Sequence, residues 1–147
     1  MKRIETIDVP QANSLIKVCN LLALVGVGIE DKRELARQLG FVSREIDYYK
    51  HAARILGFAH FVPGKEFYLS EQGEAYLSGL RPEEKKLMLG RAVRGAEVFE
   101  ELLAEIPEKD LSRVKITRFI QDRTNLNRTT AQRRADTMLA WLRYTKI

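Results

Sequence analysis

Apolar residues recur at helical spacing near the start of the chain, and glycines interrupt them. Residues 11–25 carry apolar side chains three and four positions apart, which predicts an amphipathic helix capped by Asn13 or Ser14. Residues 30–39 predict a second, shorter helix. Gly40 follows it, at the position where many helices end in the left-handed conformation that glycine adopts most easily.

A third helix and a β-hairpin come next. Ser43 is a good N-cap for a helix that Gly57 ends. The period then changes, because residues 58–62 and 66–69 are β-like runs on either side of a Pro-Gly-Lys turn. This pattern predicts a hairpin. Residues 70–80 predict a short closing helix.

The second half of the chain repeats the helical part of this order without a hairpin. Residues 84–106 predict one long helix, or two helices joined near Gly90 or Gly95. Residues 111–122 predict a short helix. After a polar turn, Thr129 is expected to cap a last helix that runs almost to the end of the chain.

This order of elements predicts the fold class. Two short helices joined by a turn with glycine form a helix-turn-helix, and a hairpin after them makes the unit winged. We therefore expect a mainly α protein with a small β-hairpin, built as a tandem winged helix or helix-turn-helix. Residues 1–80 would form an N-terminal winged-helix unit and residues 81–147 a C-terminal helix-turn-helix unit. No low-complexity linker separates them, so the two units should pack together.

Charge is distributed unevenly along the chain. The composition, 45% hydrophobic and 31% charged, argues against intrinsic disorder. The formal net charge is +5, yet residues 1–80 are neutral and residues 81–111 carry a net charge of −2. Residues 112–147 hold nine basic and two acidic residues, a net charge of +7. This concentration favours a polyanionic partner for the C-terminal unit.

Several classes of protein are disfavoured by the residues that the chain contains. Cys19 is the single cysteine, so neither an intramolecular disulfide nor a cysteine-based zinc site is expected. His51 and His60 are the only histidines and make a poor metal pair. We expect no metal and no cofactor. The N-terminus lacks the pattern of a signal peptide, and the apolar run over residues 21–27 is too short to span a bilayer. A cytoplasmic protein without membrane contact is expected.

Four segments carry a family resemblance. Residues 129–142 contain the run Thr-Ala-Gln-Arg-Arg-Ala followed by Trp-Leu, and residues 47–49, 52–57 and 68–73 match a recognition helix and the joint after a wing. Together the segments resemble winged-helix DNA-binding domains associated with restriction endonucleases. The resemblance covers most of residues 5–145 and implies a role in DNA recognition. The chain lacks the Pro-Asp and spaced Asp/Glu-x-Lys residues of such nucleases, so it implies no nuclease chemistry.

The C-terminal unit offers the clearest candidates for DNA contact. A recognition helix reads base edges from the major groove with its N-terminal residues, and arginine and glutamine are common base readers. We expect Gln132 and Arg133 to read bases. Phosphate contacts are expected from the helix N-terminus and from the helix and turn before it, through Arg118, Arg123, Arg128, Thr129 and Thr130. The alternative is a solvated basic face, with Arg134 paired to Asp136 or to another acid.

The N-terminal unit offers fewer candidates. We expect contacts from Arg44, Lys50 and His51 on the third helix, and from Lys65 at the tip of the hairpin. Most aromatic residues should lie in the core, with Tyr48 as the exposed exception. Because this unit is neutral, it could instead form a dimerisation or partner surface.

Three functions remain open from the sequence. The first is sequence-specific binding of double-stranded DNA by a regulator of transcription. The second is a protein–protein interaction module, with the acidic helix over residues 97–108 as its surface. The third is the DNA-recognition part of a restriction nuclease whose catalytic domain lies elsewhere. A homodimer or a nuclease subunit is therefore a possible partner. We expect no enzymatic activity, because the chain has no glycine-rich phosphate loop, nucleophile elbow or other catalytic constellation.

Overall fold

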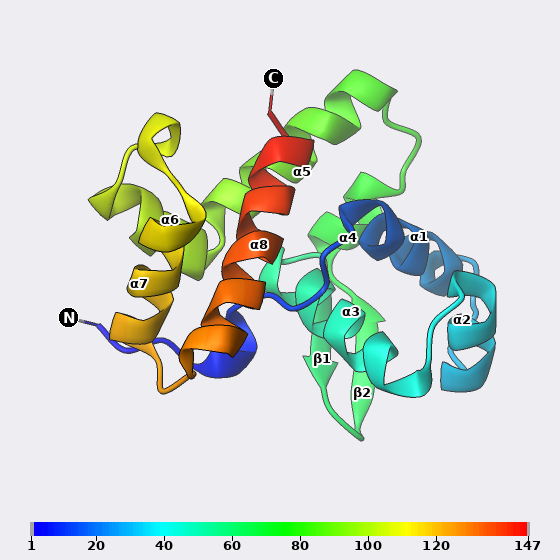
Figure 1. Cartoon of the computed structure of the whole chain (residues 1–147). Helices are drawn as coiled ribbons and strands as arrows, with labels where there is room; N and C mark the ends of the chain where they lie inside the picture. The colour runs from blue at the N-terminus through cyan, green and yellow to red at the C-terminus, as the bar shows by residue number, and fades with distance from the viewer. Residues whose placement is uncertain (1, 147) are drawn as a thin grey trace.

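A computed structural model describes residues 2–146 of the chain. Eight α-helices and one two-stranded antiparallel hairpin make up most of this part (Figure 1), which confirms the mainly α fold with a small hairpin. The elements in chain order are η1 (Thr6–Asp8), α1 (Leu15–Gly26), α2 (Lys32–Leu39), α3 (Ser43–Ile55), β1 (Ala59–Val62), β2 (Glu66–Leu69), α4 (Glu71–Tyr76), α5 (Pro82–Gly95), α6 (Glu97–Glu105), η2 (Glu108–Asp110), α7 (Arg113–Arg123) and α8 (Arg128–Tyr144). None of these helices is long and apolar enough to cross a membrane.

The first unit has the arrangement of a winged helix. Helices α1, α2 and α3 pack on one another, and the hairpin packs against α3. Phe61 pairs with Phe67 in the hairpin register. The chain then turns into α4 through Ser70, whose side chain accepts a hydrogen bond from Gly73 N at 3.1 Å. Gly73 lies against the carbonyl group of Phe58, where a Cβ atom would clash with the backbone. This close approach explains the glycine at the joint between hairpin and helix.

In the second unit, the long helical segment is divided. Of the two glycines considered, Gly95 ends α5, and Ala96 links it to α6 in an extended conformation. Gly90 instead remains inside α5, where it lies against the backbone of Thr145. Helices α7 and α8 pack closely together and are joined by a short turn, as a helix-turn-helix requires.

The N-caps differ in part from the predicted ones. Ser14 does cap α1, and its Oγ accepts from Lys17 N at 3.3 Å. Ser43, however, is the first residue of α3 and makes no cap. Thr129 likewise lies inside α8, because Asn127 is the N-cap and its Oδ1 accepts from Thr130 N at 2.9 Å. Both predicted starts are wrong by one or two residues. At α8, the side chain of Asn127 accepts from the free backbone N–H groups that Thr129 was expected to cap. At α3, the N-cap is Val42, whose backbone N–H donates to Glu45 Oε1 at 3.1 Å.

One hydrophobic cluster contains residues of both units. Trp141 of α8 is fully buried, and its ring stacks on Phe99 of α6 with the centroids 5.8 Å apart. The indole N–H donates to the carbonyl oxygen of Ala12 at 2.8 Å. The residue therefore joins α6, α8 and the N-terminal segment, residues 4–12, in one core.

The N-terminal segment, which precedes the first unit's helices, is bound by the second unit. Arg134 of α8 is buried and donates from Nη1 to the carbonyl oxygens of Thr6 at 2.7 Å and Val9 at 2.8 Å. The backbone N–H of Ile4 donates to the carbonyl oxygen of Arg123 at 2.9 Å. The expected pairing of Arg134 with an acid is therefore wrong, because backbone carbonyls take all its described hydrogen bonds.

The same segment also contacts the first unit. Arg54 of α3 donates to Asp8 Oδ1 at 2.9 Å and to the carbonyl oxygen of Ile7 at 3.0 Å. Residues 4–12 thus lie between α3 and α8 (Figure 1) and connect the two helices through hydrogen bonds on both sides. The division of the chain into units at residue 80 stays a prediction.

We expect Arg134→Ala to lower the free energy of unfolding by roughly 2 kcal/mol or more, because two buried carbonyl oxygens lose their donor. Arg133→Ala is the matched control, since its side chain is exposed on the same helix. This control should change stability by less than about 0.5 kcal/mol. Urea unfolding of the two variants measures the difference, and equal stabilities would contradict the assigned role of Arg134.

Asn127→Ala should destabilise the protein by about 1 kcal/mol, because the N-terminus of α8 loses its cap. Thr129→Ala should have a smaller effect, below about 0.5 kcal/mol, because its side chain is exposed and makes no cap. Thermal unfolding of both variants tests this. A larger effect at Thr129 than at Asn127 would instead support Thr129 as the N-cap of α8, as the sequence predicted.

Candidate nucleic-acid interface

The most exposed residues of helix α3 lie at its N-terminal end. Its other sides pack on α1, α2 and β1, and its C-terminal half is held to the N-terminal segment by Arg54. Arg44 is exposed, whereas Lys50 and His51 are half-buried. Tyr48 is also half-buried and packs on the core, so the prediction that it is exposed is wrong. The accessible part of α3 is the part that reads base edges in helix-turn-helix proteins.

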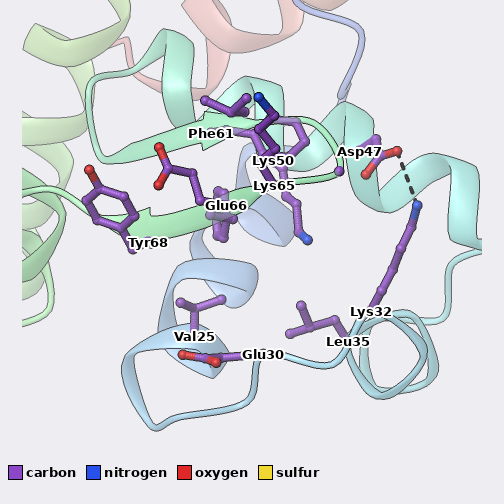
Figure 2. Close-up of a pocket in the computed structure, with 13 residues that line it drawn as sticks. Val25, Glu30, Lys32, Leu35, Asp47, Lys50, Phe61, Lys65, Glu66 and Tyr68 are labelled. Carbon is purple, nitrogen blue, oxygen red and sulfur yellow. Dashed lines mark hydrogen bonds and ion pairs between the residues drawn. The ribbon is translucent and has the colours of Figure 1, made fainter.

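A groove of about 560 Å³ lies beside the hairpin and is lined by residues of α1, α2, α3 and the hairpin (Figure 2). Lys50 lies along one wall, and its Nζ is 5.3 Å from the centre of the Phe67 ring and 5.7 Å from that of Phe61. Partial burial lowers the pKa of the Lys50 ammonium below its ordinary value. The ammonium group of Lys50 is therefore held near two aromatic rings at the wall of the groove.

Two other lysines line the groove. Lys65 is exposed at the hairpin tip, where it was predicted. Lys32 of α2 was not predicted, and its Nζ forms an ion pair with Asp47 of α3 at 3.2 Å (Figure 2). Only packing of α2 against α3 brings Lys32 to this place, so no local sequence signal could have identified it. Asp47, Glu30 and Glu66 also line the groove and reduce its positive charge.

His51 is placed so that it remains neutral near pH 7. Its ring meets Phe61 edge to face, with the centroids 4.7 Å apart. Arg54 Nε donates to His51 Nδ1 at 3.3 Å, which requires that this nitrogen carry no proton. Partial burial, together with the charge of Arg54, lowers the pKa of the imidazole below its ordinary value of 6.5. His51 therefore offers hydrogen bonding rather than charge to a partner.

The N-terminal end of α8 presents most of the other predicted residues. Arg128, Thr129 and Arg133 are exposed, and Thr130 and Gln132 are half-buried. Arg118 of the preceding helix α7 is exposed as well. The N–H group of Thr130 is already satisfied by Asn127, so phosphate contact here depends on the side chains and on the remaining N–H groups.

Arg123 is a correction to the predicted set. Its side chain is buried, with Nη1 3.1 Å from Glu101 Oε2 and Nη2 paired with Glu105. The guanidinium also lies over the ring of Phe119 at 4.8 Å. Arg123 therefore joins α7 to α6 and is not available to clamp a DNA backbone. The basic character of Arg123 predicts a surface position, whereas the residue lies on the inward face of α7.

The predicted contacts of the two units lie on one side of the molecule. In Figure 1, the N-terminal ends of α3 and α8 and the tip of the hairpin all point to the lower side of the view. Residues 4–12 lie between the two helices. The structure therefore brings the N-terminal ends of α3 and α8 and the hairpin tip to a common side, although more than 80 residues separate the starts of the two helices.

An exposed aromatic pair on the hairpin was missed by the sequence analysis. His60 and Tyr68 are cross-strand partners, with ring centroids 4.8 Å apart. Both side chains are exposed, in contrast to Phe61 on the other face of the hairpin. The alternation of β1 was the available signal, because it places neighbouring residues on opposite faces.

The described residues favour neither a metal site nor a reactive thiol. Within residues 2–146, no group of three or more His, Cys, Asp and Glu side chains could hold a metal ion. The Sγ of Cys19 lies 3.2 Å from the hydroxyl oxygen of Tyr76. Burial raises the pKa of the Cys19 thiol, so the reactive thiolate is disfavoured at neutral pH.

Comparison with known proteins finds one family. The model of a domain of unknown function, DUF7226, matches residues 15–145. No curated protein and no solved structure matches the chain.

The lowered pKa of His51 predicts a pH dependence of stability. The unfolded chain binds a proton at His51 near its ordinary pKa of 6.5, whereas the folded protein binds it only at lower pH. Stability should therefore fall as the pH drops below about 6.5. His51→Gln should reduce this loss, and NMR titration should place the pKa of His51 below 6.5. A titration of His51 above that value would contradict the assigned environment.

Proposed function

Because the chain belongs to DUF7226, a domain family of unknown function, we propose from its own geometry that it binds double-stranded DNA in a sequence-specific manner. Helix α3 and the N-terminal part of α8 would enter the grooves. The hairpin tip would contact the backbone beside α3. The proposal includes the expectation that the protein is located in the cytoplasm.

The common orientation of the two helices is the observation that supports this proposal. One side of this winged-helix-like fold presents two helix N-termini and a hairpin tip. DNA-binding proteins of this kind insert such elements into the grooves of DNA or place them beside the grooves. Arg133 and Gln132 on α8, and Arg44 on α3, would face base edges. Lys50 and Lys65 would face phosphates, because lysine provides a point charge rather than a bidentate pattern.

The use of charge in the C-terminal unit also supports DNA binding. Arg123 and Arg134 are buried and bind groups inside the protein, and Arg113 forms an ion pair with Asp136 at 2.9 Å. Arg118, Arg128 and Arg133 are exposed and form no ion pair with any residue among 2–146. Exposed arginines that no neighbour neutralises are suited to phosphates and guanine edges.

The acidic helix α6 favours the DNA-binding proposal over an interaction module built on that helix. Glu101 and Glu105 hold Arg123, and Glu97 pairs with Lys2 at 3.1 Å. Much of the acidic charge is therefore satisfied within the molecule. The DNA-binding proposal applies equally to a regulator and to the recognition part of a nuclease, and a homodimer would double the site that it reads.

Selection from a random double-stranded DNA pool at two salt concentrations tests the proposal directly. An enriched motif, with affinity that falls steeply as salt rises, is the expected result. Weak binding without enrichment, lost at moderate salt, would count against sequence-specific recognition and leave only non-specific attraction.

Arg133→Ala should weaken binding to the selected duplex by about tenfold or more and relax the preference at one base position. The matched control is Lys86→Ala, which removes an exposed positive charge from α5, away from the lower side in Figure 1. This control should leave both affinity and preference unchanged. Fluorescence anisotropy with the selected and mutated duplexes measures both. Equal losses in the two variants would show attraction by net charge alone.

A further inference from the structure

Away from the proposed DNA face, helix α5 crosses the C-terminal end of α8. The crossing is close, because a Cβ atom on Gly90 would lie 3.5 Å from the carbonyl oxygen of Thr145. Arg94 fixes the crossing by donating from Nη1 to Thr145 Oγ1 at 3.0 Å and by forming an ion pair with Glu108 at 2.8 Å. The upper part of Figure 1 shows α5 beside the end of α8.

Two hollows lie on either side of this crossing, of about 470 and 630 Å³. The lining of the first hollow includes the apolar side chains of Leu80, Pro82 and Leu89, and the second contains Leu87 among mostly polar and charged residues. Leu87 is 43% exposed and Tyr144 is 44% exposed, so both present apolar surface to a ligand. These apolar surfaces have no described partner within residues 2–146.

Positive charge surrounds the same hollows. Their lining includes Lys85, Lys86, Arg91 and Lys146, and none of these forms an ion pair with another residue of the described chain. Among the described residues, the only acid in either lining is Glu108, which forms an ion pair with Arg94. We call this surface the basic cleft, defined by Lys85, Lys86, Leu87, Arg91, Tyr144 and Lys146.

We propose that the basic cleft binds an acidic amphipathic helix of a partner protein. Apolar side chains of that helix would fill the hollows beside Leu87 and Tyr144, and its carboxylates would meet the surrounding lysines and arginine. We choose this occupant by charge complementarity. The cleft combines apolar surface with four cations that form no ion pair with another described residue, so a matching ligand needs both negative charge and apolar side chains.

A DNA duplex fits the basic cleft less well than such a helix. A phosphate backbone supplies the negative charge but no apolar side chains for the hollows. None of the cleft's residues belongs to the proposed DNA face. The inference therefore stands whether or not the protein binds DNA.

Two synthetic peptides provide the probe. Each is a fluorescein-labelled helix of roughly 18 residues, about five turns, with leucine at positions three and four apart. One peptide carries glutamate at its other positions, and the second carries lysine there. Fluorescence anisotropy measures the Kd of each peptide for the full chain, with a random-sequence DNA duplex as a third ligand.

Three protein variants locate the binding. Lys86→Glu with Arg91→Glu reverses charge in the cleft, and Leu87→Gln removes apolar surface from it. Lys17→Glu with Arg33→Glu changes the net charge by the same amount on the first unit, where both residues are exposed. Circular dichroism establishes that each variant is folded.

The glutamate peptide should bind, and the lysine peptide should not. Charge reversal in the cleft should weaken the glutamate peptide by about tenfold or more, and Leu87→Gln should weaken it by a smaller factor. The control variant should leave its Kd unchanged. In the ¹H–¹⁵N spectrum, the peptide should shift the signals of Leu87 and Tyr144.

Four results would overturn the proposal. They are failure of the glutamate peptide to bind, equal binding of both peptides, an unchanged Kd in the cleft variants, and shifts that map elsewhere. A cleft variant that weakens only the DNA duplex would assign the surface to nucleic acid. Failure of the DNA-binding proposal would appear differently, as a loss of duplex binding by the unaltered protein with peptide binding retained.

Discussion

The structure depends on how the backbone of residues 4–12 is bound by helix α8. Arg134 donates to two carbonyl oxygens of this segment, and the Trp141 indole donates to a third at Ala12. Buried carbonyl groups without donors are costly, so the segment can lie in the interior only because α8 provides these groups. In return, the two side chains are themselves satisfied within the core. This reciprocal binding connects the first residues of the chain to its last helix.

The same contact determines which surfaces are left for function. On its other side the segment holds Arg54 of α3 through Asp8 and the Ile7 carbonyl, and so covers the C-terminal half of that helix. The N-terminal half remains accessible beside the hairpin groove. Because one segment binds both α3 and α8, the spacing of the two helix N-termini is set by hydrogen bonds rather than by a flexible linker. A rigid spacing suits a binding surface formed by both units.

Some basic residues of this protein stabilise its interior and others form its surface charge, and composition alone does not distinguish the two groups. Arg123 and Arg134 are buried and hold helices or backbone in place, whereas Arg128 and Arg133 are exposed on the first turns of α8. Neighbours in sequence can differ completely, since Arg133 faces solvent and Arg134 the core. The excess charge of the C-terminal unit is therefore smaller at its surface than its count of residues suggests. The lysines around α5 form a separate surface on the other side.

The sequence by itself determined the local features of this protein. Hydrophobic periodicity identified the helices and the hairpin, and Gly40 adopts the left-handed conformation expected after α2. These features depend on a few neighbouring residues. Tertiary structure decided the rest, including the burial of Arg123, the pairing of Lys32 with Asp47 and the binding of residues 4–12. Such contacts join segments distant in sequence, and periodicity contains no information about which helix faces which.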